Sequence, residues 1–157
     1  IPYPPLDAQI HSSHITPGGV ISFIMLDMDN FKQVNDTFGH PTGDKVLVAL
    51  ANEIQRHLRE EDLFGRVGGD EFAVFLHNIA EDAPPQIADR ICASINALRF
   101  PEIDPSIQIS ASLGVYITHR VDPNQGVHGL FSQADQALFR AKESGRGQVV
   151  VTRTAQD

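Results

Sequence analysis

Residues 66 to 76 of the chain read Arg-Val-Gly-Gly-Asp-Glu-Phe-Ala-Val-Phe-Leu. Two glycines followed by two acidic residues predict a tight hairpin turn, because glycine tolerates the positive φ that such turns need. This turn would present the carboxylates of Asp70 and Glu71. The strand that leaves it, residues 72–76, is apolar at every position and is therefore predicted to be buried on both faces of a sheet.

Carboxylates at the tip of a buried hairpin keep their charge only when they are paired or bound to a metal. The residues alone leave two alternatives for Asp70 and Glu71. The turn either faces solvent and has no chemical role, or it forms part of a metal site.

A second candidate site follows the apolar run 20–26, which predicts a buried strand ending at Asp27. The next residues lead into a predicted helix whose unpaired N–H groups favour an anion, and Lys32 adds a positive charge. This arrangement suits a phosphate group. The alternative is that Asp29 or Asn30 merely caps the helix. We expect both, with one of these two residues as the cap and Asp27 in the chemistry.

The rest of the chain predicts an α/β (α+β) fold, with a mixed central sheet and flanking helices. Residues 1–19 carry four prolines and predict an irregular N-terminal segment, so the domain proper is expected over 20–157. Hydrophobic periodicity and turn residues define the elements. Strands are predicted at 20–26, 62–67, 72–77, 107–118 and 149–152, and helices at 30–37, 42–58, 84–98 and 130–141, the last one capped by Gly145.

Charge excludes several partners. The chain has 20 acidic and 12 basic residues, for a net charge of −8, which argues against binding duplex nucleic acid or an anionic membrane. A nucleoside triphosphate would therefore need a divalent cation such as Mg²⁺. No apolar run predicts a membrane span or a signal peptide. The single Cys92 is expected to be a buried thiol, as in a reducing compartment, and we predict a cytoplasmic location.

Several motifs, taken in chain order, resemble the GGDEF family of diguanylate cyclases. They are Asp-Met-Asp-Asn-Phe-Lys at 27–32, Asn-Asp-Thr-Phe-Gly-His at 35–40, Gly-Asp at 43–44, Gly-Gly-Asp-Glu-Phe at 68–72, Ala-Asp at 134–135, Ala-Lys at 141–142 and Gly-Arg at 145–146. The resemblance implies a fold similar to the palm of nucleotidyl cyclases and polymerases. It also implies that two GTP molecules are condensed to cyclic di-GMP and two pyrophosphates.

The resemblance further implies a role for each matching residue. The catalytic residues would be Asp27, Asp70 and Glu71. Mg²⁺, or Mn²⁺ in its place, would be held by Asp27, the Met28 carbonyl and Asp70, with Glu71 as a further ligand or as the group that deprotonates the attacking 3′-hydroxyl. Guanine would be read by Asn35 and Asp44, with His40 beside them. The phosphates would be held by Phe31, Lys32, Lys142 and Arg146. Four of these residues alone also fit an ordinary place at a helix end, namely Asn35, Asp44, Lys142 and Arg146.

The family resemblance also implies partners and regulation. Because each domain holds one GTP, catalysis would require a homodimer, and an upstream sensor domain would lie in the full-length protein, which could be membrane-anchored. Product would inhibit the enzyme at a site made of Arg59, Asp62 and Arg90.

Residues 1–19 lack the family's Asp-x-Leu-Thr-Gly-Leu-x-Asn-Arg motif, so that part is either truncated or a divergent first helix. This departure keeps a second interpretation open, in which the domain binds GTP or cyclic di-GMP and relays a signal without turnover. A monomeric nucleotidyltransferase for another base fits Asn35 and Asp44 less well.

Overall fold

The computed structural model describes residues 19–120 and 124–154. Its elements, in chain order, are β1 (Val20–Met28), α2 (Phe31–Phe38), α3 (His40–Arg56), β2 (Leu63–Arg66), β3 (Glu71–Ile79), α4 (Ala83–Asn96), β4 (Ala111–Thr118), α5 (Gly126–Glu143) and β5 (Val149–Arg153). This is the predicted α+β order. Residues 1–18, most of the predicted irregular segment, lie outside the described residues.

The five strands form one mixed sheet in the order β2-β3-β1-β4-β5. β1 lies at its centre and pairs antiparallel with both β3 and β4, whereas β4 and β5 are parallel. All nine residues of β1 are buried, as its apolar sequence predicts for a central strand covered on both faces. Residues 72–76 of β3 are likewise all buried, which confirms that prediction.

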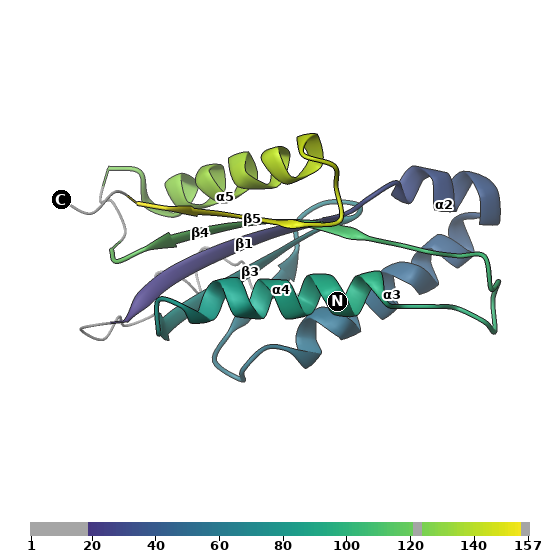
Figure 1. Ribbon diagram of the computed structural model, residues 1–157, viewed down its shortest axis with the longest axis horizontal. Helices are drawn as coiled ribbons and strands as arrows, with labels where there is room; N and C mark the ends of the chain where they lie inside the picture. Colours follow the sequence, from purple (N-terminus) through teal and green to yellow (C-terminus); the bar gives the residue numbers. More distant parts are fainter. Residues whose placement is uncertain (1–18, 121–123, 155–157) are drawn as a thin grey trace.

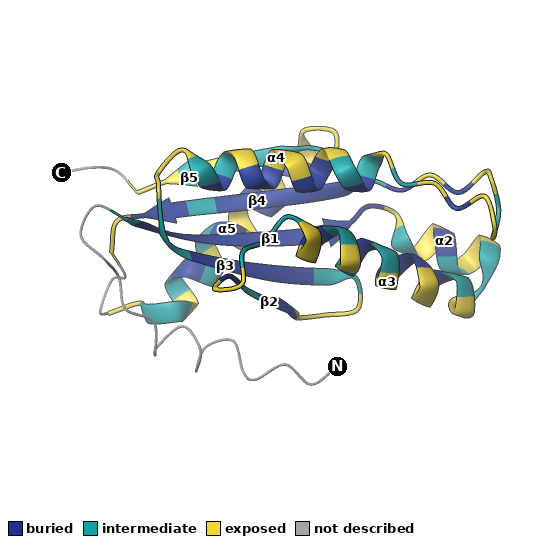
Figure 2. Cartoon of the chain, turned by 90° about the horizontal axis from the view of Figure 1, so that it is seen from below, coloured by how far each residue is buried: buried dark blue, intermediate teal, exposed yellow. Residues whose placement is uncertain are grey.

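Helices cover both faces of the sheet. Figure 1 shows α5 on one side of the strands and α3 and α4 on the other, and Figure 2 shows α3 and α4 in front of the sheet. Along β1, Ile24 and Leu26 pack with the α3 and α4 residues, whereas Phe23 and Met25 pack with α5. This alternation follows from the two-residue period of a strand, and it directs Asp27 towards α5.

Helix α5 lies unusually close to the sheet at Gly114 in β4. A Cβ at this position would overlap the backbone nitrogen of Leu138 and the carbonyl oxygen of Ala134. Glycine therefore permits direct contact between the helix backbone and the strand. The last turn of α5 then ends as predicted at Gly145, where the Arg146 N–H donates to the Ala141 carbonyl at 3.0 Å.

Three local predictions differ from the structure. The strand predicted at 107–118 is confined to 111–118, because β1 ends at Met28 opposite Ala111 and offers residues 107–110 no ladder partner. Helix α3 begins at His40 rather than Thr42, with Pro41 in its first turn. Neither Gly68 nor Gly69 is among the glycines with positive φ, so the prediction of a turn that depends on glycine conformation is wrong.

None of the described helices is both long and apolar enough to cross a bilayer.

Candidate functional site

An acidic cluster lies where β1 and β3 end side by side. Asp27 and Glu71 are direct partners in the antiparallel ladder, so their side chains share the α5 face of the sheet. The Met28 N–H donates to the Asp70 carbonyl oxygen at 3.2 Å, which brings the hairpin turn against the end of β1. The structure therefore places the three predicted catalytic residues together.

Lys142 of α5 supplies the positive charge of this cluster. Its ammonium group contacts Oδ2 of Asp27, whose side chain is only 12% exposed. The other oxygen of that carboxylate, Oδ1, is buried and has no hydrogen-bond partner. A buried acceptor of this kind carries a desolvation cost, so Asp27 has a coordination position to offer a cation.

Two carboxyl groups of the cluster, those of Asp27 and Glu71, have raised pKa values. Burial raises the pKa of Asp27 to about 6 against the opposing effect of Lys142, and the neighbouring Asp70 carboxyl adds to the rise. Burial also raises the pKa of Glu71, with a further contribution from the charge of Asp135 on α5. Carboxylates that repel one another in this way favour a bound cation.

The carboxylates of Asp27 and Asp70 suit a metal ion that is held partly by the protein and partly by a bound nucleotide. Within residues 19–120 and 124–154, no three His, Cys, Asp or Glu side chains gather as a metal-binding group. Mg²⁺ commonly uses only one or two carboxylates and completes its octahedron with phosphate oxygens and water. The unpartnered Asp27 oxygen beside Asp70 therefore fits Mg²⁺ held jointly with a nucleotide, rather than a cage made by protein side chains alone.

Arg66 determines the form of the hairpin turn. Its guanidinium donates to the Gly68 carbonyl at 3.0 Å and to the Gly69 carbonyl at 2.9 Å. The Val67 N–H donates to the Glu71 carbonyl at 2.9 Å. A side chain thus holds the turn that was expected to depend on glycine conformation.

The predicted guanine-recognition residues lie where α2 meets α3. Gly43, in the first turn of α3, is buried, and a Cβ there would overlap Oδ1 of Asn35. The same Cβ would lie 3.4 Å from the ring of Phe31. Asn35 Oδ1 is buried against Gly43 and has no hydrogen-bond partner. Asp44 is exposed next to Gly43 and adds a carboxylate.

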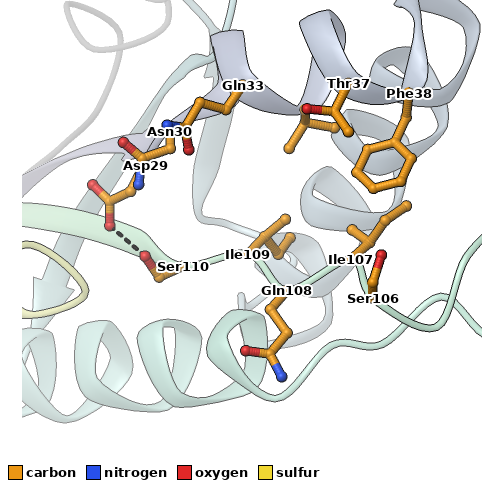
Figure 3. Close-up of a pocket in the computed structure, with 11 residues that line it drawn as sticks. Asp29, Asn30, Gln33, Thr37, Phe38, Ser106, Ile107, Gln108, Ile109 and Ser110 are labelled. Carbon is orange, nitrogen blue, oxygen red and sulfur yellow. Dashed lines mark hydrogen bonds between the residues drawn. The ribbon is translucent and has the colours of Figure 1, made fainter.

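Two cavities flank α2 and α3. One, of about 380 Å³, lies between α3 and the hairpin and includes Asp44 but not Asn35 in its wall. It is lined by Asp44, Leu47, Val48, Ala51, Phe64, Arg66 and Phe72. The other, of about 370 Å³, lies between α2 and residues 106–110. Figure 3 shows Asp29 and Ser110 at one end of this second cavity, joined by a hydrogen bond. Its wall does not include Asp27, Asp70 or Glu71.

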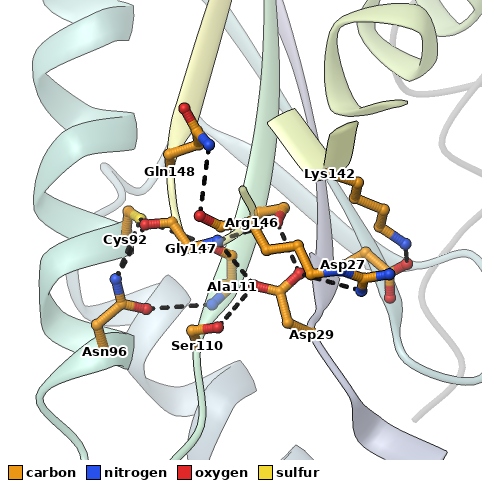
Figure 4. A network of polar contacts seen from close by, with 11 residues as sticks. Asp27, Asp29, Cys92, Asn96, Ser110, Ala111, Lys142, Arg146, Gly147 and Gln148 are labelled. Atoms are coloured by element: carbon orange, nitrogen blue, oxygen red, sulfur yellow. Dashed lines mark hydrogen bonds and ion pairs between the residues drawn. The ribbon is translucent and has the colours of Figure 1, made fainter. Parts of the chain in front are cut away.

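The prediction that the side chain of Asp29 or Asn30 caps α2 is wrong. Asn30 is in a left-handed conformation at the N-cap and makes no side-chain capping hydrogen bond. The Asp29 carboxylate instead accepts hydrogen bonds from Ser110, Ser112 and the Gly147 N–H (Figure 4). Asp29 therefore joins the end of β1 to the loop before β5, where Arg146 lies.

Arg59 and Asp62, two of the residues predicted for the inhibitory site, form an ion pair. Arg59 donates to Asp62 from Nε at 3.0 Å and from Nη2 at 2.7 Å, and the Asp62 side chain is fully buried. The guanidinium also donates to the His77 carbonyl at 2.9 Å. Arg90 lies on α4, and its charge contributes to the lowered pKa of His57 at the end of α3.

Other predicted substrate contacts lie apart from the acidic cluster. Lys32 on α2 and His40 at the start of α3 are exposed. Arg146 extends beside Asp29, with 3.9 Å between Nη1 and Oδ1.

Sequence reasoning gave no role to Asp135, although its charge acts on Glu71. A signal was present, because Asp135 and Lys142 are seven residues apart and so share one face of a helix. Ser110 and Ser112 were also missed. Their two-residue spacing is typical of side chains on one face of an extended segment.

Comparison with known proteins finds a family model and relatives that match most of the chain. The family model "Diguanylate cyclase, GGDEF domain" matches residues 5–148. Diguanylate cyclase DgcP of Pseudomonas aeruginosa is 39% identical over 146 residues, which cover 93% of this chain and 21% of that protein. The chain thus spans about a fifth of the length of this curated relative.

Two solved structures are similar throughout the fold. The active GGEEF domain of a diguanylate cyclase from Vibrio cholerae has a TM-score of 0.78 and 33% identity, covering 87% of this chain and 85% of that one. The GGDEF domain of DgcB from Caulobacter crescentus, in complex with c-di-GMP, has a TM-score of 0.80 and 30% identity, covering 93% of this chain and 85% of that one.

Proposed function

Because the chain belongs to the GGDEF domain family of diguanylate cyclases, we propose that it condenses two GTP molecules to cyclic di-GMP and two pyrophosphates. One observation carries this proposal. Asp27, Asp70 and Glu71 meet at the end of the β1–β3 ladder, and Lys142 faces them from α5. Transfer of a nucleotidyl group depends mainly on positioned charges of both signs, and this cluster supplies them.

Asp27, Asp70 and the Met28 carbonyl would hold Mg²⁺ or Mn²⁺, with Glu71 as a further ligand. The unpartnered Oδ1 of Asp27 supports this assignment. When bound, the metal supplies positive charge to the triphosphate and makes the attacking hydroxyl more acidic.

Glu71 is also suited to accept the proton of the 3′-hydroxyl. Its raised pKa, caused first by burial and then by Asp135, brings its basicity closer to neutral pH than that of an ordinary glutamate. Ligand and base are alternative roles for this carboxylate.

Asn35 and Asp44 would recognise the base. Guanine presents N–H donors on its Watson–Crick edge, and both side chains offer oxygen acceptors. The buried, unpaired Oδ1 of Asn35 supports this role, as does the cavity of about 380 Å³ beside Asp44. His40 would lie at the margin of the base.

Lys142 and Arg146 would hold the phosphates, with Phe31 and Lys32 contributing from the start of α2. Lys142 here neutralises Asp27. The same ammonium would turn to the triphosphate when a metal on Oδ1 of Asp27 neutralises that carboxylate and so weakens its attraction for Lys142.

A homodimer would be needed for the reaction. One domain offers one set of base and phosphate contacts, whereas the product joins two GMP units, so a second copy must present the second GTP. The greater length of the curated relative supports additional domains, an upstream sensor among them. We place the reaction in the cytoplasm, where GTP is available.

Product inhibition would act at Arg59, Asp62 and Arg90. Asp62 already orients the Arg59 guanidinium from a buried position, and an oriented guanidinium can bind a phosphate or a guanine edge through parallel hydrogen bonds.

The same preformed pair favours a second function, in which the domain only binds cyclic di-GMP and relays a signal. One experiment separates the two functions. The purified chain is incubated with GTP and Mg²⁺, and the nucleotides are separated by chromatography. Cyclic di-GMP and pyrophosphate are expected in a ratio of one to two. Binding of cyclic di-GMP without turnover of GTP would favour the signal-relay function.

A further inference from the structure

The loop between α5 and β5 carries an unusual backbone. Arg146 has φ 65° and Gly147 has φ 61°. A left-handed conformation is ordinary for glycine but unfavourable for arginine. Such a conformation persists only where the surroundings impose it, and it is concentrated at functional sites.

Two side chains from different parts of the chain hold the residue next to it. Asp29 accepts the Gly147 N–H at 2.9 Å, and Asn96 at the end of α4 donates from Nδ2 to the Gly147 carbonyl at 3.3 Å. Figure 4 shows Asn96 and Asp29 on opposite sides of Gly147. Both polar groups of this residue are thereby fixed.

Both side chains are themselves anchored. Asn96 Oδ1 accepts the Ala111 N–H of β4 at 3.1 Å. The Asp29 carboxylate accepts hydrogen bonds from the hydroxyls of Ser110 and Ser112, each at 2.6 Å. Two positions on the rigid sheet thus support the loop.

Asp29 is unsuited to direct contact with a substrate or a metal. The residue is 3% exposed, and its two oxygens already accept three hydrogen bonds and lie 3.9 Å from the Arg146 guanidinium. In this respect it differs from Asp27, which keeps an unpartnered oxygen.

We propose that Asp29 and Asn96 are positioning residues that act through Gly147 to hold Arg146 where it binds the phosphates of GTP. This inference rests on the proposed phosphate-binding role of Arg146. Without the two contacts, the loop would lose the left-handed conformation at Arg146, and the guanidinium would be directed elsewhere.

Asn96→Asp tests the proposal, and it also removes the contact from Asn96 Nδ2 to Cys92 Sγ at 3.6 Å. The variant keeps an oxygen for the Ala111 N–H and replaces the donor to the Gly147 carbonyl with a second acceptor, which repels it. Ser94→Ala is the matched control, because Ser94 lies on the same helix but contacts Glu53 of α3. Circular dichroism and thermal unfolding establish that each variant is folded.

The probe is the α,β-methylene analogue of GTP, which cannot release pyrophosphate, and guanosine, which has no phosphate, serves for comparison. Equilibrium binding is measured by calorimetry with Mg²⁺ for the parent, Asn96→Asp, Arg146→Ala and the double variant. Both single variants are expected to lose about tenfold in affinity for the analogue, as for one charge-assisted hydrogen bond, with the affinity for guanosine unaffected. The double variant should lose no more than Arg146→Ala alone.

Other outcomes overturn the proposal in distinguishable ways. If Arg146→Ala weakens the analogue but Asn96→Asp does not, or if their effects add, the positioning role is wrong and the phosphate role stands. Equal loss for guanosine in Asn96→Asp would show general damage to the site and overturn the proposal. If Arg146→Ala has no effect on the analogue, the phosphate role itself fails, and the positioning role with it.

Discussion

The ammonium group of Lys142 contacts Oδ2 of Asp27, although 115 residues separate the two in the chain. One residue belongs to α5 and the other to β1. The height of α5 above the sheet therefore determines whether the acidic cluster has its positive charge. That height is fixed at Gly114, where the helix backbone touches the strand.

Gly114→Ala should therefore reduce both stability and activity. The added methyl group would overlap the backbone of Leu138 and Ala134, and overpacking against backbone typically costs about 1–3 kcal/mol or more. Urea denaturation should show this loss, and turnover of GTP should fall in the fraction that remains folded. Gly65→Ala is the control, because a Cβ there meets nothing within 4 Å. Equal stability of the two variants would show that α5 can move without cost.

Asp70→Asn should abolish most turnover and leave the fold intact. The backbone bond from Met28 to the Asp70 carbonyl is retained, whereas a charged ligand beside Asp27 is lost. Loss of one preorganised electrostatic group commonly lowers rates by ~10²–10³. Initial rates of pyrophosphate release at saturating Mg²⁺ measure the effect, with the thermal unfolding midpoint as the check on folding. A variant as fast as the parent would exclude Asp70 from metal binding.

Gly43→Ala should weaken guanine recognition without weakening the phosphate contacts. The new Cβ would displace the Asn35 amide, and a site that loses a buried hydrogen-bonding group loses much of its selectivity. Affinity for GTP should fall at least tenfold, while affinity for pyrophosphate with Mg²⁺ stays within about twofold. Asp44→Ala is expected to give the same difference between the two ligands. A parallel loss of both ligands would instead indicate a general disturbance of α3.

His57 offers a pH-dependent test of the inhibitory site. Its pKa is lowered from 6.5, first by burial and next by the charge of Arg56, with a contribution from Arg90. A phosphate anion at Arg90 would favour the charged imidazolium, so cyclic di-GMP should raise this pKa. A titration of the imidazole proton by NMR, assigned with His57→Gln, measures the shift.

Arg59→Ala should remove that rise together with binding of the product, and Arg59→Lys should not restore it, because lysine lacks the planar pair of donors. Persistence of the pKa rise in Arg59→Ala would place the product elsewhere.

Much of the fold was predictable because the pattern of apolar residues matches the elements. Residues 20–26 and 72–76 predict central strands through continuous apolar runs, and both are buried as expected. The limits of the strand 107–118 were not predictable in this way. Its first residues are β-branched or alternate in polarity, but whether they join a ladder depends on where the partner strand ends.

The sequence predicted which candidate site residues lie together better than it predicted their contacts. The motif order predicted that Asp27, Asp70 and Glu71 act together, and the strand order β3-β1 brings them together. The role of Asp29 was missed because an acidic residue before a helix usually caps it. Its actual partners, Ser110 and Gly147, are distant in sequence, and no local pattern indicates such contacts.

The central position of β1 has a consequence for biosynthesis. β1 is the first described strand to leave the ribosome, yet its two neighbours, β3 and β4, end at Ile79 and Thr118. A nascent chain therefore carries a largely apolar strand with unsatisfied edges until most of the domain has been synthesised, a state prone to aggregation. The contact between Asp27 and Lys142 forms later still. A chain interrupted before α5 would contain every residue of the acidic cluster but not the cation that faces it.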